Sequence, residues 1–225
     1  MLKFLKKHAD HLFLLLTFIL ITASAIYFRQ PPYRYLPLCV SMIIYLMQSR
    51  ISRYAYLLGS LNSVLYAVVY VGLGIYASAA SALLLSFPMQ MVIFFMWKKR
   101  ADGQTTYLRR MSLSWRLGTT AGFILAWVGL YFLLRTLNST AQILDNTATL
   151  LGILVSLLAM FSFIEYTYLQ IPSYLLNIML QAWLMKENPG QITYVILSAY
   201  GVVLAVQAVF RAQAIYKRQQ SEKTA

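Results

Sequence analysis

The sequence predicts an all-α membrane protein with about eight transmembrane helices, and three observations support this fold class. The 225 residues are 60% hydrophobic and only 11% charged, whereas soluble domains usually contain about 25% charged residues. Apolar runs of about twenty residues recur along the chain, and a helix of that length spans the ~30 Å hydrocarbon core of a bilayer. Turn signals separate several of these runs, namely Pro31-Pro32, Gly72-Leu73-Gly74 and Asn188-Pro189-Gly190.

The first predicted span covers 11–28 and follows a basic N-terminus with Lys3, Lys6 and Lys7. This pattern is close to that of a signal peptide, but it lacks a convincing cleavage site and more spans follow. We therefore expect it to be retained as a helix. The other predicted spans are 33–49, 54–71, 76–97, 115–134, 147–165, 171–186 and 192–214, with longer connections around 98–114 and 135–146.

The positive charges predict the orientation of these spans. If the N-terminus is cytoplasmic, 15 of the 19 Lys and Arg residues fall in cytoplasmic segments, and the four outside are Arg29, Arg34, Arg135 and Lys186. Because cytoplasmic loops of membrane proteins are rich in Lys and Arg, this bias predicts a multi-pass protein of the cell membrane with both termini in the cytoplasm. The same rule explains the net charge of +13 without a nucleic-acid partner.

An internal repeat is predicted within this single polytopic domain, residues 1–225. With an offset of 118, Tyr56-Leu57-Leu58 aligns with Tyr174-Leu175-Leu176, Tyr76 with Tyr194, and Lys99-Arg100 with Lys217-Arg218. The predicted parts are an extra N-terminal helix (1–30), a first repeat (31–100), a linker with a connecting helix (101–146), a second repeat (147–218) and a cytoplasmic tail (219–225). This 1+3+1+3 arrangement has two parallel three-helix repeats, and transporters built in this way bind substrate near the midplane between the repeats.

The connecting helix carries Gly118 and Gly122 at a GxxxG spacing. This spacing lets another helix backbone approach closely. Packing within the monomer and a contact between subunits both remain open interpretations.

Histidine is absent from the apolar runs, and cysteine occurs in them once. The only cysteine, Cys39, lies in an apolar run, and His8 and His11 precede the first apolar run, which begins at Leu12. We therefore expect no metal, no cofactor and no enzymatic activity. The six acids, which near the midplane would indicate ion coupling, all fall at span ends or in loops: Asp10, Asp102, Asp145, Glu165, Glu187 and Glu222. A facilitator is favoured over a proton-driven pump, although a sodium site built from backbone carbonyls stays open.

Uncharged polar side chains inside the spans form the predicted binding site, together with two aromatic residues. Asn62 and Tyr66 share one helix face, and Asn177 and Gln181 repeat that spacing. Amides offer donors and an acceptor without charge, which suits ribose hydroxyls or a carboxamide, and aromatic rings can stack on a flat heterocycle. The alternative is hydrogen bonding between helices, which is common for amides in membrane bundles. The candidate residues are Asn62, Tyr66, Gln90, Asn177, Gln181, Trp183 and Gln207.

The segment 81–100, SALLLSFPMQMVIFFMWKKR, preceded by GLGIY, resembles the fourth-span signature of the PnuC-type vitamin transporters. The family pattern is an aliphatic and aromatic run, then Pro-X-Gln, then Trp-Lys-Lys, and it is matched by Pro88, Gln90, Trp97, Lys98 and Lys99. Leu144-Asp145 at the predicted opening of the sixth span, followed some twenty residues later by Glu165, is a second likeness.

The resemblance implies a SWEET-like fold and facilitated diffusion of a vitamin or nucleoside, with nicotinamide riboside as the best-known substrate. It also implies a homotrimer in the lipid membrane and a cytoplasmic kinase that traps the substrate by phosphorylation. One departure concerns the family's Trp-x-x-Trp-x-x-x-Asn motif, whose tryptophans stack on the substrate ring. With Asn177 as its asparagine, the tryptophan positions are occupied by Gln170 and Ser173. Nicotinamide riboside is our first choice, with thiamine, riboflavin and (deoxy)nucleosides as alternatives.

Two readings outside this family remain. An intramembrane lipid-modifying enzyme is disfavoured because such enzymes use clusters of His, Asp or Cys near the interface. A membrane adaptor would use the basic loop 98–114 as a docking surface. We expect Trp97 and Trp115, which flank that loop, to be interfacial anchors.

Overall fold

The described chain folds into eight α-helices, because its apolar runs hold few helix-breaking residues. The computed structural model describes residues 2–72, 79, 82–103, 105–136 and 142–224. A π-helical turn η1 (Ala82–Ser86) precedes α5, a 3₁₀ turn η2 (Pro189–Gln191) precedes α9, and two short antiparallel strands, β1 (Ala101–Asp102) and β2 (Thr105–Thr106), follow α5. The α-helices are α1 (Leu2–Tyr27), α2 (Pro32–Ser49), α3 (Tyr54–Gly72), α5 (Phe87–Lys99), α6 (Leu113–Thr136), α7 (Gln142–Met160), α8 (Glu165–Leu184) and α9 (Ile192–Thr224).

Several predicted boundaries differ from the helix ends. α1 begins at Leu2 and α9 ends at Thr224, nine and ten residues beyond the predicted spans, and α7 ends at Met160 rather than at 165. The spans predicted at 147–165 and 171–186 begin at Gln142 and Glu165 instead, five and six residues earlier. The break between them is a tight turn at Ser162, where φ is +60°, and it lies where the apolar run of α7 gives way to the more polar segment 162–170, which contains Glu165. Pro172, predicted near the start of a span, lies inside α8. The predicted turn at 72–74 and the start of the fourth span at Tyr76 include residues outside the described part of the chain.

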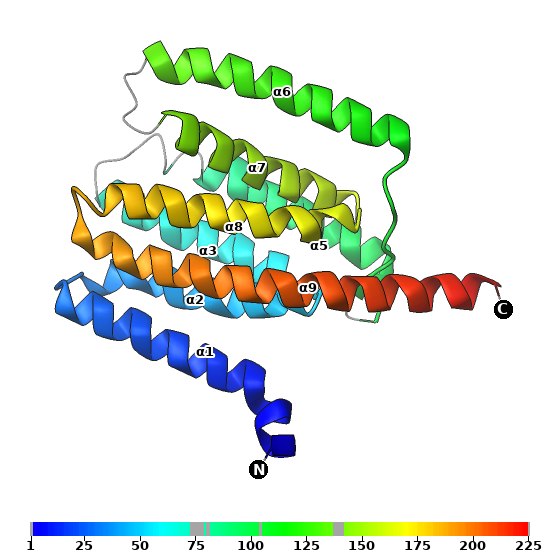
Figure 1. Ribbon diagram of the computed structural model, residues 1–225, viewed down its shortest axis with the longest axis horizontal. Coiled ribbons are helices and arrows are strands. Elements are labelled where there is room, and N and C mark those ends of the chain that lie inside the picture. Colours follow the sequence, from blue (N-terminus) through cyan, green and yellow to red (C-terminus); the bar gives the residue numbers. More distant parts are fainter. Residues whose placement is uncertain (1, 73–78, 80–81, 104, 137–141, 225) are drawn as a thin grey trace.

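Length and composition identify three of the described helices as able to cross a membrane: Asp10–Tyr27, Ile143–Met160 and Pro189–Glu222. A shorter apolar helix covers Tyr54–Val69. The remaining helices lie lengthwise beside these (Figure 1), as expected for neighbouring spans of one bundle.

Six of the helices form a closed ring. Around it, α2 packs on α3, α3 on α5, α5 on α7, α7 on α8, α8 on α9, and α9 on α2 again. The other two helices lie at opposite edges of the molecule, α1 against α2 and α9, and α6 against α7 (Figure 1). This order is the one that two three-helix units around a common axis would give, although the predicted repeat itself stays a prediction.

The helix starts do not follow the predicted offset of 118. The starts of α3 and α8, Tyr54 and Glu165, are 111 positions apart, not 118. The turns before them are alike, because Ile51 and Ser162 both have positive φ and each donates its amide to the carbonyl three residues back. The end of α1 at Arg29 uses the same turn, so the turn alone does not establish a repeat.

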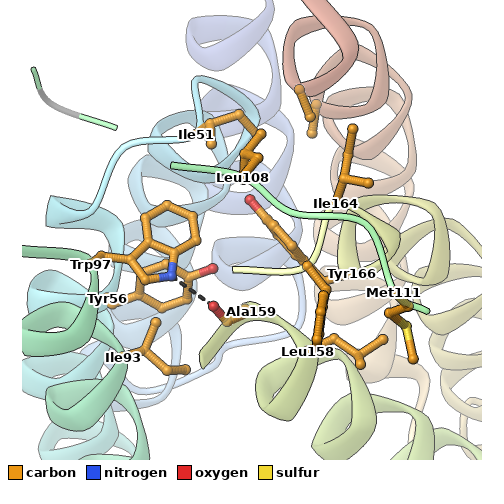
Figure 2. Close-up of a cluster of buried hydrophobic side chains, with 13 residues drawn as sticks. Ile51, Tyr56, Ile93, Trp97, Leu108, Met111, Leu158, Ala159, Ile164 and Tyr166 are labelled. Carbon is orange, nitrogen blue, oxygen red and sulfur yellow. Dashed lines mark hydrogen bonds between the residues drawn. The ribbon is translucent and has the colours of Figure 1, made fainter. Parts of the chain in front are cut away.

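A cluster of buried side chains joins the two halves of the ring at one end. Trp97 of α5 is fully buried, and its Nε1 donates a hydrogen bond of 2.7 Å to the carbonyl oxygen of Ala159 on α7 (Figure 2). Its ring contacts Tyr56 and Tyr166 edge to face, with centroids 4.9 and 6.0 Å away. The prediction that Trp97 is an interfacial anchor is therefore wrong: burial and the hydrogen bond make it a core residue.

Four of the five ion pairs among the described residues link different segments at this same end. Asp10 near the start of α1 pairs with Arg211 of α9 at 2.9 Å and with Arg50 after α2 at 3.4 Å. Glu165 accepts from Arg116 of α6 at 3.3 Å and from the backbone amide of Met111 at 3.1 Å. These carboxylates act as clasps between helices.

Asp102 of β1 forms a further clasp, with the last turns of α9. Its carboxylate accepts hydrogen bonds from Arg218 and, at 2.7 Å, from Gln219 Nε2. Gln219 also donates to the Thr106 carbonyl at 3.1 Å and accepts from the Leu108 amide at 3.0 Å. The basic loop after α5 is thereby bound to the C-terminal helix.

Candidate functional site

A polar cavity of about 260 Å³ lies inside the ring, among α2, α3, η1, α5 and α7. Ten of its thirteen lining residues have hydroxyl or amide side chains, and among the described residues no charged side chain lines it. Tyr56 and Ile93 belong both to this lining and to the buried cluster around Trp97, so that cluster closes one end of the cavity. The hydroxyl and amide residues are Ser41, Tyr45, Gln48, Tyr56, Asn62, Ser63, Tyr66, Ser86, Gln90 and Ser156.

Asn62 links α3 to α2 and leaves one acceptor free. Its Nδ2 donates to Ser41 Oγ at 2.9 Å and to the Pro37 carbonyl at 3.2 Å. Ser41 Oγ in turn lies 3.3 Å from the Tyr66 hydroxyl. The Asn62 side chain is 4% exposed, and its Oδ1 is buried without a hydrogen-bond partner. An unpaired buried acceptor is costly, and a ligand hydroxyl or amide in the cavity could satisfy it.

Gln90 reaches the cavity from α5 across a glycine. Its Nε2 donates to Ser63 Oγ at 3.3 Å. A Cβ atom on Gly59 would lie 1.8 Å from Gln90 Oε1. Any side chain larger than that of glycine at position 59 of α3 would therefore displace the Gln90 amide. The Gly59 backbone and Ser63 together position the Gln90 amide.

The second half of the ring lines the cavity with Ser156 of α7, and a side chain of α8 that the sequence did not identify as a site residue packs behind the lining. Tyr174 of α8 packs on Tyr45 with ring centroids 4.9 Å apart, and its hydroxyl lies 3.4 Å from Gln48 Oε1. Both partners line the cavity. The i, i+3 spacing of Tyr45 and Gln48 on α2 was a signal for a shared face. It was missed because Gln48 lies close to the end of the predicted span.

The structure divides the predicted site residues into two groups. Asn62, Tyr66 and Gln90 come together around the one cavity, whereas Asn177, Gln181, Trp183 and Gln207 are not among its lining residues. The members of the second group are placed as follows. Asn177 Nδ2 donates to the Ser173 carbonyl of its own helix at 2.9 Å, Gln181 is half-buried on α8, Trp183 is 47% exposed beneath Lys186, and Gln207 has a buried Oε1 without a partner.

The positions of the family's stacking residues are also resolved. Gln170 and Ser173 are 6% and 8% exposed, so they are buried in the packing of α8. The aromatic lining of the cavity comes instead from Tyr45, Tyr56 and Tyr66 of the first half.

The chemistry that this arrangement offers is hydrogen bonding and ring contact. Amides and hydroxyls pair with neutral polar groups, and tyrosine faces attract flat or positively charged rings. Within the described residues, no group of His, Cys, Asp or Glu is suited to hold a metal ion. The geometry fits the reversible binding of a small polar molecule.

Comparisons with known proteins agree with this geometry. The model of the nicotinamide mononucleotide transporter family matches residues 32–217, from the start of α2 into α9. The crystal structure of the vitamin B3 transporter PnuC superposes with a TM-score of 0.77 at 19% sequence identity, covering 94% of this chain and 93% of that one. At this identity the likeness concerns the fold. No match was found among curated proteins.

Proposed function

This chain belongs to the nicotinamide mononucleotide transporter family, and we propose on that premise that it carries nicotinamide riboside across the cell membrane by facilitated diffusion. In this proposal both termini are cytoplasmic, and a cytoplasmic kinase traps the substrate by phosphorylation. Thiamine, riboflavin and (deoxy)nucleosides are the alternative substrates.

The observation that carries the proposal is the uncharged cavity with the free Asn62 acceptor and three tyrosines. Nicotinamide riboside presents ribose hydroxyls and a carboxamide, which amides and hydroxyls can bind, and a positively charged pyridinium ring. That ring gains cation–π attraction from tyrosine faces, an advantage that a neutral nucleoside base lacks.

The size of the cavity favours the smaller candidates. Sites for drug-sized ligands usually measure about 300–1,000 Å³, and this cavity is slightly below that range at about 260 Å³. Riboflavin, with three fused rings and a ribityl chain, is the largest of the candidate substrates and the least suited to it.

Facilitated diffusion is supported by the position of the acids. Asp10, Asp102 and Glu165 are each bound to arginine at one end of the bundle. A carboxylate that couples transport to an ion would be expected near the cavity, and the described lining offers none. These clasps also lie at the end where the Lys and Arg bias places the cytoplasm.

A homotrimer is proposed with a contact on α6. A Cβ atom on Gly118 or Gly122 would meet no described atom within 4 Å. Because this GxxxG face is open within the chain, close packing there would require another subunit.

The test uses purified protein in vesicles with radiolabelled nicotinamide riboside. We expect saturable uptake that stops at the external concentration and exceeds it only when a riboside kinase and ATP are enclosed. Thermal-shift measurements with all four substrate classes identify the ligand, because only a bound ligand stabilises the folded state by mass action. Accumulation of nicotinamide riboside above the external concentration without a kinase would refute facilitated diffusion. Stabilisation of the folded protein by thiamine alone would refute nicotinamide riboside as the substrate.

Site variants separate the two groups of predicted residues. Asn62→Leu and Gln90→Leu should weaken binding, whereas Asn177→Leu, the matched control on α8, should leave it within about twofold. A loss of binding in Asn177→Leu alone would place the site in the second half of the ring.

A further inference from the structure

A second cavity, separate from the polar one, opens between the outlying helix α6 and the helices α7 and α8. It measures about 720 Å³. On α6 it is lined by Arg116, Thr119, Thr120 and Phe123, whose spacing places them on one helix face. We name it the α6 groove.

The facing wall of the α6 groove is apolar. Leu151, Leu154 and Leu158 follow one face of α7, and Leu169 adds to it from α8. Seven residues of helix cover about 10 Å at ~1.5 Å per residue, a large part of the ~15 Å that one leaflet contributes to the hydrocarbon core.

One end of the α6 groove, where Arg116 pairs with Glu165, is basic. Arg110 and Arg116 line it there with a single acid, Glu165. The Arg116 side chain is 55% exposed although it pairs with Glu165 at 3.3 Å, and Arg110 is held over the Tyr216 ring at 5.2 Å. Two guanidinium groups against one carboxylate leave a net positive charge at the mouth of an apolar slot.

We propose that the α6 groove binds one anionic phospholipid from the leaflet on that side. Its phosphate contacts Arg110 and Arg116, because guanidinium groups bind phosphate oxygens in a bidentate way. One acyl chain lies against the leucines of α7 and against Phe123. Trp115, 47% exposed beside the mouth, lies where aromatic residues contact lipid head groups.

Charge complementarity favours a lipid over a second copy of the chain as the occupant. An apolar helix from another subunit would leave the arginines facing hydrocarbon, whereas an anionic head group neutralises them. Gly118 is two residues, or about 200°, from Arg116, so it lies on the opposite side of α6 from the basic end of the groove. A subunit contact centred on Gly118 would leave that end of the groove available.

The experiment is native mass spectrometry of the full chain, delipidated in detergent and titrated with phosphatidylglycerol or phosphatidylcholine. We expect one phosphatidylglycerol to be retained in preference to phosphatidylcholine. The double variant Arg110→Gln/Arg116→Gln should lower that preference by about fivefold for each arginine. Lys98→Gln/Lys99→Gln removes the same charge from the same end outside the groove and should retain the preference.

Two further variants keep the test decisive. Thr120→Trp fills the slot without changing charge and should reduce retention of both lipids. Glu165→Gln removes the competing carboxylate and should raise retention of phosphatidylglycerol. The proposal is overturned by equal phosphatidylglycerol binding in the arginine variant, by an equal loss in the lysine variant, or by a change in subunit number on filling the slot.

Discussion

Exchanging Gly59 for alanine adds one methyl group and should displace the Gln90 amide from the cavity lining without harming the fold. The new Cβ would lie 1.8 Å from Gln90 Oε1 and 2.9 Å from its Cδ. The first distance is about 1.6 Å short of the 3.4 Å at which ordinary contact begins. The flexible Gln90 side chain therefore has to withdraw, and its 3.3 Å hydrogen bond to Ser63 is lost.

The expected magnitude follows from that single displacement. A hydrogen bond between uncharged groups contributes about 1 kcal/mol, so losing the Gln90 contact to the substrate should weaken binding roughly fivefold. Alanine is favoured over glycine inside a helix by about 0.8–1 kcal/mol. This gain offsets the lost bond to Ser63, and the thermal midpoint should hardly change.

The assay is substrate affinity by calorimetry together with vesicle uptake, in a cycle of Gly59→Ala, Gln90→Ala and the double variant. If the methyl group acts through Gln90, the double variant binds as Gln90→Ala does. Gly152→Ala on α7 is the matched control, since its Cβ would meet nothing within 4 Å. Unchanged affinity in Gly59→Ala, or additive losses in the double variant, would refute the reasoning.

Three further changes test other parts of the structure. Trp97→Phe removes the indole donor to the Ala159 carbonyl, which keeps its hydrogen bond from the Ser162 amide. Losing this one hydrogen bond should lower the free energy of unfolding by about 1 kcal/mol; an unchanged denaturation midpoint would contradict this. Asp102→Asn weakens the clasp to Gln219 and should speed amide hydrogen exchange in the last turns of α9, with the other helices as internal control. Gly201→Ala would place a Cβ 2.9 Å from the Tyr174 ring. It should weaken substrate binding less than Gly59→Ala does, because the ring needs to move only about 0.5 Å to reach ordinary contact.

Much of the fold was predictable because helix length and charge are strong signals in a membrane protein. The eight helices follow the apolar runs, and ion pairs such as Arg50 with Asp10 lie at the end where the charges predicted the cytoplasm. The predicted boundary between α7 and α8 was late because Glu165 was expected to end a span, whereas it begins α8 directly after the turn at Ser162. Hydropathy shows where an apolar run becomes more polar, and it does not locate a turn made by backbone angles.

The site was half predictable for a related reason. Amides in membrane helices stand out, so Asn62 and Gln90 were identified, but Asn177 has the same chemistry and bonds to its own helix. Helical periodicity shows which residues share a helix face. It does not show whether that face points into the cavity or toward another helix. Trp97 illustrates the same limit, because a tryptophan beside a lysine pair is typical of an interface and here it is buried between α5 and α7.

Two glycines explain why the cavity is where it is. Glycine inside a helix costs about 0.8–1 kcal/mol relative to alanine, so a helical glycine that a neighbour crosses has a packing role. Gly59 of α3 lies under the Gln90 amide, and Gly201 of α9 lies under the Tyr174 ring. Each glycine lets a polar side chain from the next helix of the ring approach the backbone and reach the cavity lining. The two glycines thus allow close packing between α3 and α5 and between α8 and α9, beside one side chain that lines the cavity and one that contacts its lining.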